Sequence, residues 1–210
     1  MTAIFLDLDG TLMDSRPGIL SSLKAAFHEV GRDDLANDDL TWMIGPSFQE
    51  TFKKIGLADP AAATAAYRRH YDEGGAMFDA KVFHGIHDML ERLKEDGHRL
   101  YLATAKPILA ARKITAHFGI APSMIAEFGP EMDGTRNFKG DLLEHALQVT
   151  GETAKDAVMV GDRHHDFDAA IHVGMPSVAV KWGYGQAEEW EAANHSIQTP
   201  EHLHEVVSGL

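Results

Sequence analysis

Two aspartates lie one residue apart where an apolar run near the N-terminus ends. In the segment AIFLDLDGTLMD, the run Ala3–Leu6 leads into Asp7, Leu8 and Asp9. Because side chains alternate along an extended strand, Asp7 and Asp9 are expected to point the same way and Leu8 toward the core. Gly10 lets the backbone turn tightly and approach a ligand. Two carboxylates this close resist joint ionisation without a cation, and Mg²⁺ binds one or two carboxylates together with substrate phosphate. The pair therefore predicts a cation and phosphate site; the alternative is a loop of solvated acids.

A second pair of acids follows a later apolar run. Asp162 and Asp166 come after Ala157–Gly161 and are four residues apart, so they share a face if a helix begins there. The alternative for this pair is that Asp162 is a helix N-cap and Asp166 a surface acid. Because parallel strands present their carboxyl ends at one edge of a sheet, acids that follow two such strands are expected to converge.

Two further segments have residues suited to binding an anion. Thr104 ends the apolar run Arg99–Thr104, and Lys106 and Pro107 follow it, with Pro107 expected in the first turn of a helix. Free N–H groups at that turn and the Thr104 hydroxyl suit a phosphate. Lys139 precedes another predicted helix, where the macrodipole disfavours a cation, so we expect it to neutralise the carboxylates. The alternatives are an ordinary N-cap for Thr104 and solvated surface positions for both lysines.

These residues must be positioned by the strands that they follow. Strands alternate with amphipathic stretches, among them Ile86–Leu93, which Gly97 ends, and Leu142–Val149. This alternation predicts an α/β fold with a doubly wound parallel sheet and right-handed crossovers. The near-continuous apolar character of the strands fits burial on both faces. The predicted strands are Ala3–Leu8, Arg99–Thr104, Met124–Phe128, Ala157–Gly161 and Ser177–Lys181.

A long segment separates the first strand from the helix that leads to the second. That helix starts near Gly85, whereas a plain connection spans about 2–6 residues. Apolar stripes over Ile19–Val30, Phe48–Ile55 and Ala61–Tyr71 predict that the segment is helical. The predicted domains are therefore a core of residues 1–14 and 82–210 and an inserted helical domain of residues 15–81.

The composition of the chain disfavours several kinds of partner and excludes several kinds of site. The 210 residues have a formal net charge of −13, which disfavours binding to nucleic acid polymers or anionic membranes. The absence of cysteine excludes disulfides, zinc–thiolate sites and cysteine nucleophiles. No signal peptide is visible and no apolar run approaches the roughly 20 residues that span a bilayer. A cytoplasmic protein, monomeric or homodimeric, is expected.

The order of these groups along the chain resembles the haloacid dehalogenase superfamily. Its motifs are matched by Asp7-Leu8-Asp9-Gly10-Thr11, Thr104, Lys139, and Gly161-Asp162 with Asp166. The resemblance implies a Rossmann-like core and a helical cap inserted after the first motif, where the insertion is predicted.

Details of the motifs indicate a branch of the superfamily. Dehalogenases lack the second acid of the first motif, so Asp9 favours phosphoryl transfer. Trp42–Phe48 is similar to the cap segment of phosphoglycolate phosphatase-like proteins, and Ala103–Pro107 with Asp133–Gly140 is similar to a 5′-nucleotidase-like subgroup. Two departures, Ala105 in place of a common serine and His84 in place of a common proline, leave the substrate open.

The resemblance also implies a role for each site residue. Asp7 forms an aspartyl-phosphate, and Asp9 protonates the leaving oxygen and then activates water. Mg²⁺ is expected on Asp7, the Asp9 backbone carbonyl and Asp162, with Asp166 in the outer shell. The residues expected to bind the phosphoryl group are Gly10, Thr104, Ala105, Lys106 and Lys139, with Lys106 ranked below Lys139. Those expected to line the cap are Gly45, Pro46 and Ser47.

Several alternatives remain open from the sequence. The expected activity is hydrolysis of a small-molecule phosphate ester, and a phosphosugar mutase, a phospho-accepting signalling domain and a silent binding protein are the rivals. A histidine metal site at His164 and His165 is disfavoured because neighbouring helical residues point to different faces. Trp182–Gly185 is either a rim loop or ordinary packing.

Overall fold

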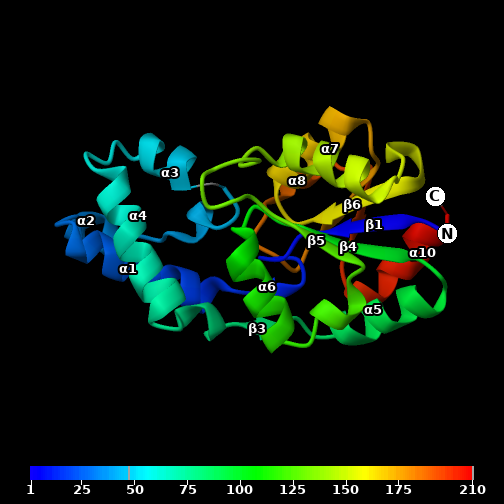
Figure 1. Ribbon diagram of the computed structural model, residues 1–210, viewed down its shortest axis with the longest axis horizontal. Coiled ribbons are helices and arrows are strands. Elements are labelled where there is room, and N and C mark those ends of the chain that lie inside the picture. The colour runs from blue at the N-terminus through cyan, green and yellow to red at the C-terminus, as the bar shows by residue number, and fades with distance from the viewer. Residues whose placement is uncertain (47, 210) are drawn as a thin grey trace.

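The computed structural model describes residues 1–46 and 48–209, without the side chains of Gln49 and Glu50 (Figure 1). Ser47, predicted to line the cap, lies outside the described residues. A parallel sheet forms the centre of the molecule. Its strands, in spatial order, are β5 (Ala126–Phe128), β4 (Arg99–Ala103), β1 (Ala3–Leu6), β6 (Ala157–Gly161), β7 (Ser177–Val180) and β8 (His195–Ile197).

The strand order is that of a doubly wound sheet. β1 pairs in parallel with both β4 and β6, and Phe5 lies opposite Tyr101 on one side and Met159 on the other. The chain therefore builds one half of the sheet outward from β1 and then the other half from β6. This is the Rossmann order, and it confirms the predicted fold class.

The strand boundaries differ from the prediction in instructive places. β1 ends at Leu6 rather than Leu8, because the Leu8 carbonyl accepts hydrogen bonds from the amides of Leu12 and Met13 and turns the chain. β8 was not predicted, since only Ile197 of its residues is buried and an edge strand of this kind has no apolar run. β4, β5 and β7 are each slightly shorter than predicted.

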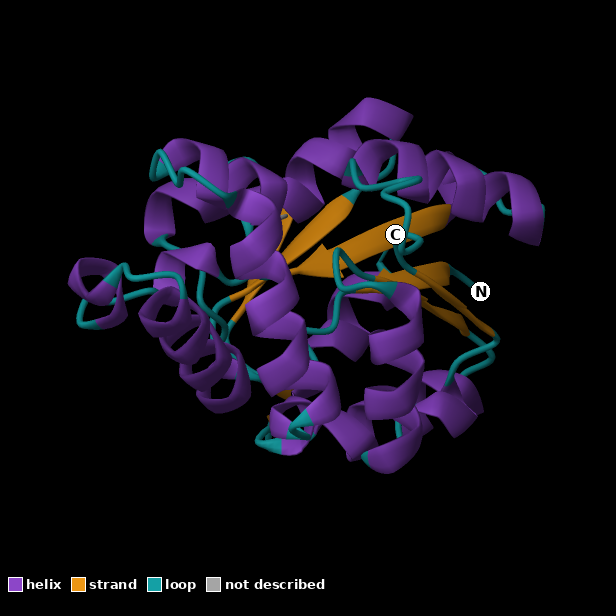
Figure 2. Cartoon of the chain, turned by 60° about the vertical axis from the view of Figure 1, so that its left-hand side comes forward, coloured by secondary structure: helices purple, strands orange, loops and turns teal. Residues whose placement is uncertain are grey.

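Helices cover both faces of the sheet (Figures 1 and 2). Ala3 and Phe5 of β1 pack into the cluster on one face, and Ile4 and Leu6 pack into the cluster on the other. This alternation explains why the strand is apolar throughout. The helices on the Phe5 face are α7 (Lys139–Thr150) and α8 (His164–Val173); those on the Ile4 face are α5 (Ile86–Glu95), α6 (Ile108–His117) and α10 (Leu203–Ser208).

A helical segment lies beyond the carboxyl ends of the strands, on the left of Figure 1. We call this segment, which runs between β2 (Met13–Asp14) and β3 (Lys81–Val82), the cap. β2 and β3 form an antiparallel ribbon that was not predicted, because strands of this length have no periodicity. The assignment of residues 15–81 to a separate domain stays a prediction. The cap helices are α1 (Arg16–Glu29), α2 (Asp33–Ala36), α3 (Phe48–Lys54) and α4 (Pro60–Arg68), and α4 continues into a π-helical turn, η2 (Arg69–Glu73).

The remaining elements are short. A single helical turn, α9 (Ala187–Trp190), precedes β8. No helix in residues 1–46 or 48–209 has the length and apolar character needed to cross a membrane. The 3₁₀ turns are η1 (Thr41–Met43), η3 (Ala76–Phe78), η4 (Ala121–Ser123), η5 (Ala154–Asp156) and η6 (Pro200–His202).

Candidate active site

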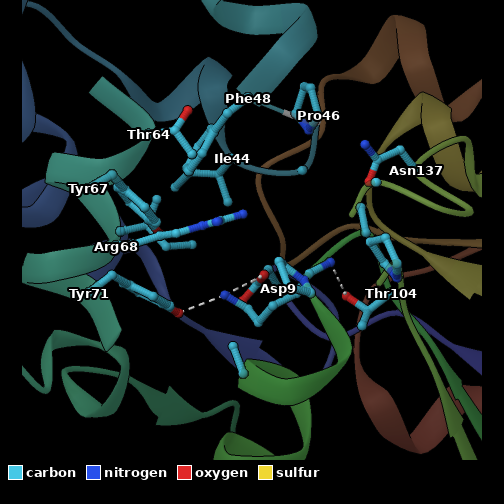
Figure 3. A pocket seen from close by; sticks show the side chains of 18 of the residues that line it. Asp9, Ile44, Pro46, Phe48, Thr64, Tyr67, Arg68, Tyr71, Thr104 and Asn137 are labelled. Carbon is cyan, nitrogen blue, oxygen red and sulfur yellow. Dashed lines mark hydrogen bonds and ion pairs between the residues drawn. The ribbon is translucent and has the colours of Figure 1, made fainter. Parts of the chain in front are cut away.

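A cavity of about 690 Å³ lies between the carboxyl ends of the strands and the cap (Figure 3). Pockets of roughly 300–1,000 Å³ are typical of small-molecule sites. The core and the cap both contribute to its wall. The core residues in the wall include Asp7, Asp9, Thr104, Lys139 and Asp166, and the cap residues include Ile44, Pro46, Phe48, Tyr67 and Tyr71.

Lys139 joins two of the predicted acids. It is the first residue of α7, and its Nζ donates a hydrogen bond to Asp7 Oδ1 at 2.7 Å and another to Asp166 Oδ1. All three side chains are buried. The alternative of a solvated surface lysine is therefore wrong, and the lysine neutralises carboxylates as predicted from its unfavourable position at a helix start.

Burial and neighbouring charges change the pKa values of Asp7 and Lys139. Desolvation raises the pKa of Asp7 to about 6, with Lys139 opposing the shift and the charge of Asp166 adding to it. Burial alone lowers the pKa of Lys139, but the attraction of Asp166 and Asp7 outweighs it, so that the pKa lies above its ordinary value. Lys139 is therefore a fixed cation beside Asp7.

Asp162 follows β6 and is fully buried. Its Oδ2 accepts a hydrogen bond from the Tyr184 amide at 2.6 Å, while its Oδ1 has no hydrogen-bond partner among the described residues. Burial raises the pKa of Asp162 well above its ordinary value, and repulsion from Asp166 and Asp7 adds to the shift. The residue is not the helix cap that the alternative required, since α8 begins at His164 after Arg163.

Three carboxylates have the arrangement of a cation site. Asp7, Asp162 and Asp166 each offer one oxygen, and these oxygens lie within 4.8 Å of one another. An all-oxygen donor set suits a hard cation such as Mg²⁺, and a cation there would relieve the repulsion that adds to the effect of burial on the pKa values of Asp7 and Asp162. The unpartnered Asp162 Oδ1 fits the same interpretation. The carboxylate of Asp9 is not in this cluster; only its backbone carbonyl was expected to bind metal.

Two glycines allow the backbone to approach Asp162. Gly10 has a φ of +86°, and a Cβ at this position would collide with the Asp162 carboxylate. A Cβ at Gly183 would collide with the Gly10 carbonyl and with the Asp162 side chain. The segment that contains Gly183 and Tyr184 therefore holds Asp162 in place, a role that its sequence did not reveal. The only available signal was a pair of glycines around an aromatic residue after a strand.

Lys106 connects Asp9 to the cap. Its Nζ lies 3.0 Å from Asp9 Oδ2 and 2.6 Å from the hydroxyl of Tyr71. Lys106 is buried, so the surface alternative is wrong. Asp7 and Asp9 both line the cavity, and each is paired with a different buried lysine, Asp7 with Lys139 and Asp9 with Lys106. Leu8 between them packs into the hydrophobic core, as predicted.

Thr104 lies directly after β4 and is buried in the cavity wall. Its amide donates to the Phe128 carbonyl at 3.0 Å, and its Oγ1 accepts from the Lys106 amide at 3.2 Å. The N-cap alternative is wrong, because Pro107 occupies the cap position of α6. The hydroxyl proton of Thr104 remains available to a ligand, and Ala105 also lines the cavity.

Two residues at the start of α8 differ from expectation. The rings of His164 and His165 lie with their centroids 3.7 Å apart, so the prediction that they point to different faces is wrong. His164 Nδ1 lies 2.6 Å from Glu189 Oε1. His165 lines the cavity, and burial followed by the charge of His164 lowers its pKa to about 4. His165 is therefore neutral at neutral pH.

Arg163 is a second link between core and cap that the sequence did not reveal. Its Nη1 donates to the Ile44 carbonyl at 2.5 Å, and its Nε lies 3.0 Å from Glu189 Oε2. Gly45 and Pro46 line the cavity as predicted.

Comparisons with known proteins agree with this geometry. The family model described as haloacid dehalogenase-like hydrolase matches residues 4–180. The tyrosine-protein kinase PtkA of Mycobacterium tuberculosis is 39% identical over 197 residues, which cover 93% of this chain and 67% of that protein. A 5′-nucleotidase of Pseudomonas aeruginosa is 38% identical over 192 residues, which cover 90% of this chain and 86% of that protein.

A solved structure resembles the whole chain. The crystal structure of a predicted phosphatase from Clostridium acetobutylicum superimposes with a TM-score of 0.93 and 33% identity, and the match covers 100% of this chain and 99% of that one. Together with the family model, which spans most of the chain, this shows that the protein belongs to the haloacid dehalogenase-like hydrolases, as an enzyme of their phosphatase type.

Proposed function

We propose that the protein hydrolyses a small-molecule phosphate monoester, with Mg²⁺, through an aspartyl-phosphate on Asp7. The observation that carries the proposal is the grouping of Asp7 with Lys139 and the carboxylates of Asp162 and Asp166, where Asp7, Lys139 and Asp166 line the cavity together with Asp9. This arrangement supplies a nucleophile, an acid and a fixed cation around one reaction centre. Each of these residues is given the role that the family motifs imply for it.

In the first step, a carboxylate oxygen of Asp7 attacks phosphorus, and the bond from phosphorus to the ester oxygen breaks. Asp9 gives its proton to that oxygen. Lys139 and the Thr104 hydroxyl bind the equatorial oxygens, assisted by the backbone amides near Gly10 and Ala105. We assign this transfer to Asp9 Oδ1, because this oxygen has no hydrogen-bond partner among the described residues whereas Oδ2 contacts Lys106.

In the second step, water attacks the phosphorus of the aspartyl-phosphate and Asp9 accepts its proton, which releases phosphate and restores Asp7. Mg²⁺ held by Asp7 and Asp162 would neutralise the charge of the phosphoryl oxygens. Asp166 keeps Lys139 in place from the outer shell. Fixed charges of this kind, placed before the reaction starts, are the usual source of rate in phosphoryl transfer.

The cavity favours a substrate larger than phosphoglycolate. Phosphoglycolate would leave most of the roughly 690 Å³ unfilled, whereas a nucleoside monophosphate places a ribose and a base there. Ile44, Phe48 and Tyr67 supply apolar and aromatic surface for such a group (Figure 3). We therefore favour the 5′-nucleotidase-like alternative over the phosphoglycolate phosphatase-like one. A cytoplasmic location and a monomeric or homodimeric state stay predictions.

The experiment is a panel of phosphate monoesters assayed for released phosphate with Mg²⁺ and with EDTA. Hydrolysis by the wild type, its loss in EDTA and its loss in Asp7→Asn are expected. Asp168→Asn is the matched control, since Asp168 is an exposed acid on α8. Full activity of a folded Asp7→Asn variant would contradict the proposal.

The rival activities give different results in the same assay. A mutase would return a sugar phosphate isomer instead of free phosphate. A signalling domain would hold its phospho-aspartate for minutes or longer after a burst. A kinase activity, suggested by the name of the mycobacterial relative, would transfer phosphate from ATP to tyrosine.

A further inference from the structure

A chain of contacts runs from the cap through the core to Asp9. The Tyr71 hydroxyl lies 2.6 Å from Lys106 Nζ, and that nitrogen lies 3.0 Å from Asp9 Oδ2. Figure 3 shows Tyr71 pointing from the cap toward Asp9. Tyr71 belongs to the cap, 35 residues away from Lys106 in sequence. The contacts are therefore complete only when the cap lies over the core.

The three side chains are removed from water. Tyr71 is 3% exposed, Lys106 is 7% exposed and Asp9 is 8% exposed. In such a site the contact between an ammonium group and a carboxyl oxygen is scarcely screened, and each polar atom needs a defined partner. The ammonium group of Lys106 also lies 4.6 Å from the centre of the Tyr71 ring, so both the hydroxyl and the ring restrict its position.

The two oxygens of Asp9 have different surroundings. Lys106 contacts Oδ2, whereas Oδ1 is buried without a hydrogen-bond partner among the described residues. Holding one oxygen restricts the rotation of the carboxyl group and leaves the other without a competing partner among the described residues. Oδ1 is the atom that must reach the leaving oxygen, and a misplacement of about 1 Å can cost roughly a hundredfold in rate.

The backbone that bears Tyr71 is unusual. α4 ends at Arg68, and the chain continues as the π-helical turn η2, with Tyr71 at its centre. π-helical turns are rare and occur frequently at functional sites. The ring of Tyr71 also stacks on that of Tyr67 at 5.1 Å, which fixes its direction.

We propose that Tyr71 is a positioning residue for Asp9, acting through Lys106, so that proton transfer to the leaving oxygen requires the cap to be in place. The proposal rests on the proposed function. In this step the proton on Asp9 Oδ1 moves to the ester oxygen as the bond between that oxygen and phosphorus breaks. Tyr71 and Lys106 keep their own protons throughout.

The test compares two esters of similar shape, phenyl phosphate and p-nitrophenyl phosphate. Phenolate is a poor leaving group that needs a proton, whereas p-nitrophenolate leaves readily without one. Tyr71→Phe is expected to lower kcat/KM for phenyl phosphate by about tenfold and that for p-nitrophenyl phosphate by less than about twofold. The ratio of the two values reports the proton transfer and is insensitive to a general loss of folded enzyme.

Tyr101→Phe is the matched control. Tyr101 is also a buried tyrosine whose hydroxyl bonds a charged group, Glu152 at 2.8 Å, but it lies on β4 away from the cavity wall. This variant should keep the wild-type ratio. A double variant tests the route: in a Lys106→Met background, Tyr71→Phe should change the ratio no further.

Two outcomes would overturn the proposal. One is an unchanged ratio in Tyr71→Phe, including equal losses for both esters, and the other is a full additional effect in the Lys106→Met background. The result that would contradict the proposed function is distinct: the wild type would then hydrolyse neither ester. The positioning role of Tyr71 would be contradicted with it.

Discussion

Lys139 Nζ lies 2.7 Å from Asp7 Oδ1, inside a group of buried carboxylates. The pair joins the first residue of α7 to the residue that follows β1, 132 positions apart in sequence. Because desolvation raises the pKa of Asp7 and Lys139 opposes that shift, the lysine keeps the proposed nucleophile largely ionised at neutral pH. The same contact therefore stabilises the folded site and maintains the charge of the proposed nucleophile.

Removing this lysine should cost stability as well as activity. In Lys139→Met, Asp7 and Asp166 lose their buried counter-ion, and breaking such a pair typically costs about 3–5 kcal/mol. Urea unfolding in EDTA measures the change. Lys155→Met, at an exposed position, should stay within about 0.5 kcal/mol of the wild type. Equal stabilities of the two variants would contradict the importance assigned to the pair.

Divalent cations should stabilise the folded protein. The oxygens of Asp7, Asp162 and Asp166 lie within 4.8 Å of one another, and Mg²⁺ would relieve their repulsion. At about a hundred times its Kd, Mg²⁺ should raise the melting temperature by roughly 5–10 °C relative to EDTA. Asp162→Asn should abolish the shift and Asp168→Asn should retain it. A shift of the same size in both variants would argue for binding elsewhere.

Gly10→Ala should disturb Asp162. The added Cβ would collide with the Asp162 carboxylate at a backbone with a φ of +86°. Gly31→Ala separates the effect of the backbone conformation from the effect of the collision, because Gly31 has a φ of +73° and nothing within 4 Å of its added Cβ. We expect a loss of about 1 kcal/mol in Gly31→Ala with unchanged kcat. Gly10→Ala should be less stable than that and nearly inactive, as measured by urea unfolding and phosphate release.

A cluster remote from the cavity should contribute to acid stability. Glu152 lies 2.7 Å from Arg99 Nη2, and this hydrogen bond lowers the pKa of Glu152 below its ordinary value of 4.5 despite partial desolvation. A carboxylate with a lowered pKa stabilises the folded state fully above its unfolded-state pKa and loses that contribution as the pH falls through its folded-state pKa. The stability gap between wild type and Glu152→Gln should therefore close below about pH 4.5. A constant gap from pH 7 to pH 3 in urea unfolding would contradict this.

The sequence by itself determined the sheet and the identity of the acids. β1 and β6 are apolar on both faces and each is followed by aspartates, and parallel strands bring such ends to one edge. The order of Asp7, Thr104, Lys139 and Asp162 along the chain was therefore enough to predict one site. The short pairing of β2 with β3 and the edge strand β8 escaped prediction, because neither has a periodic apolar pattern.

Only the tertiary structure decided which distant residues support the site. Tyr71 meets Lys106 from the cap, and Tyr184 meets Asp162 from the loop after β7. Periodicity is a local property of the chain, so it specifies an element and its buried face. Contacts between segments far apart in sequence depend on how those elements pack, and the shape of the cavity depends on the same packing.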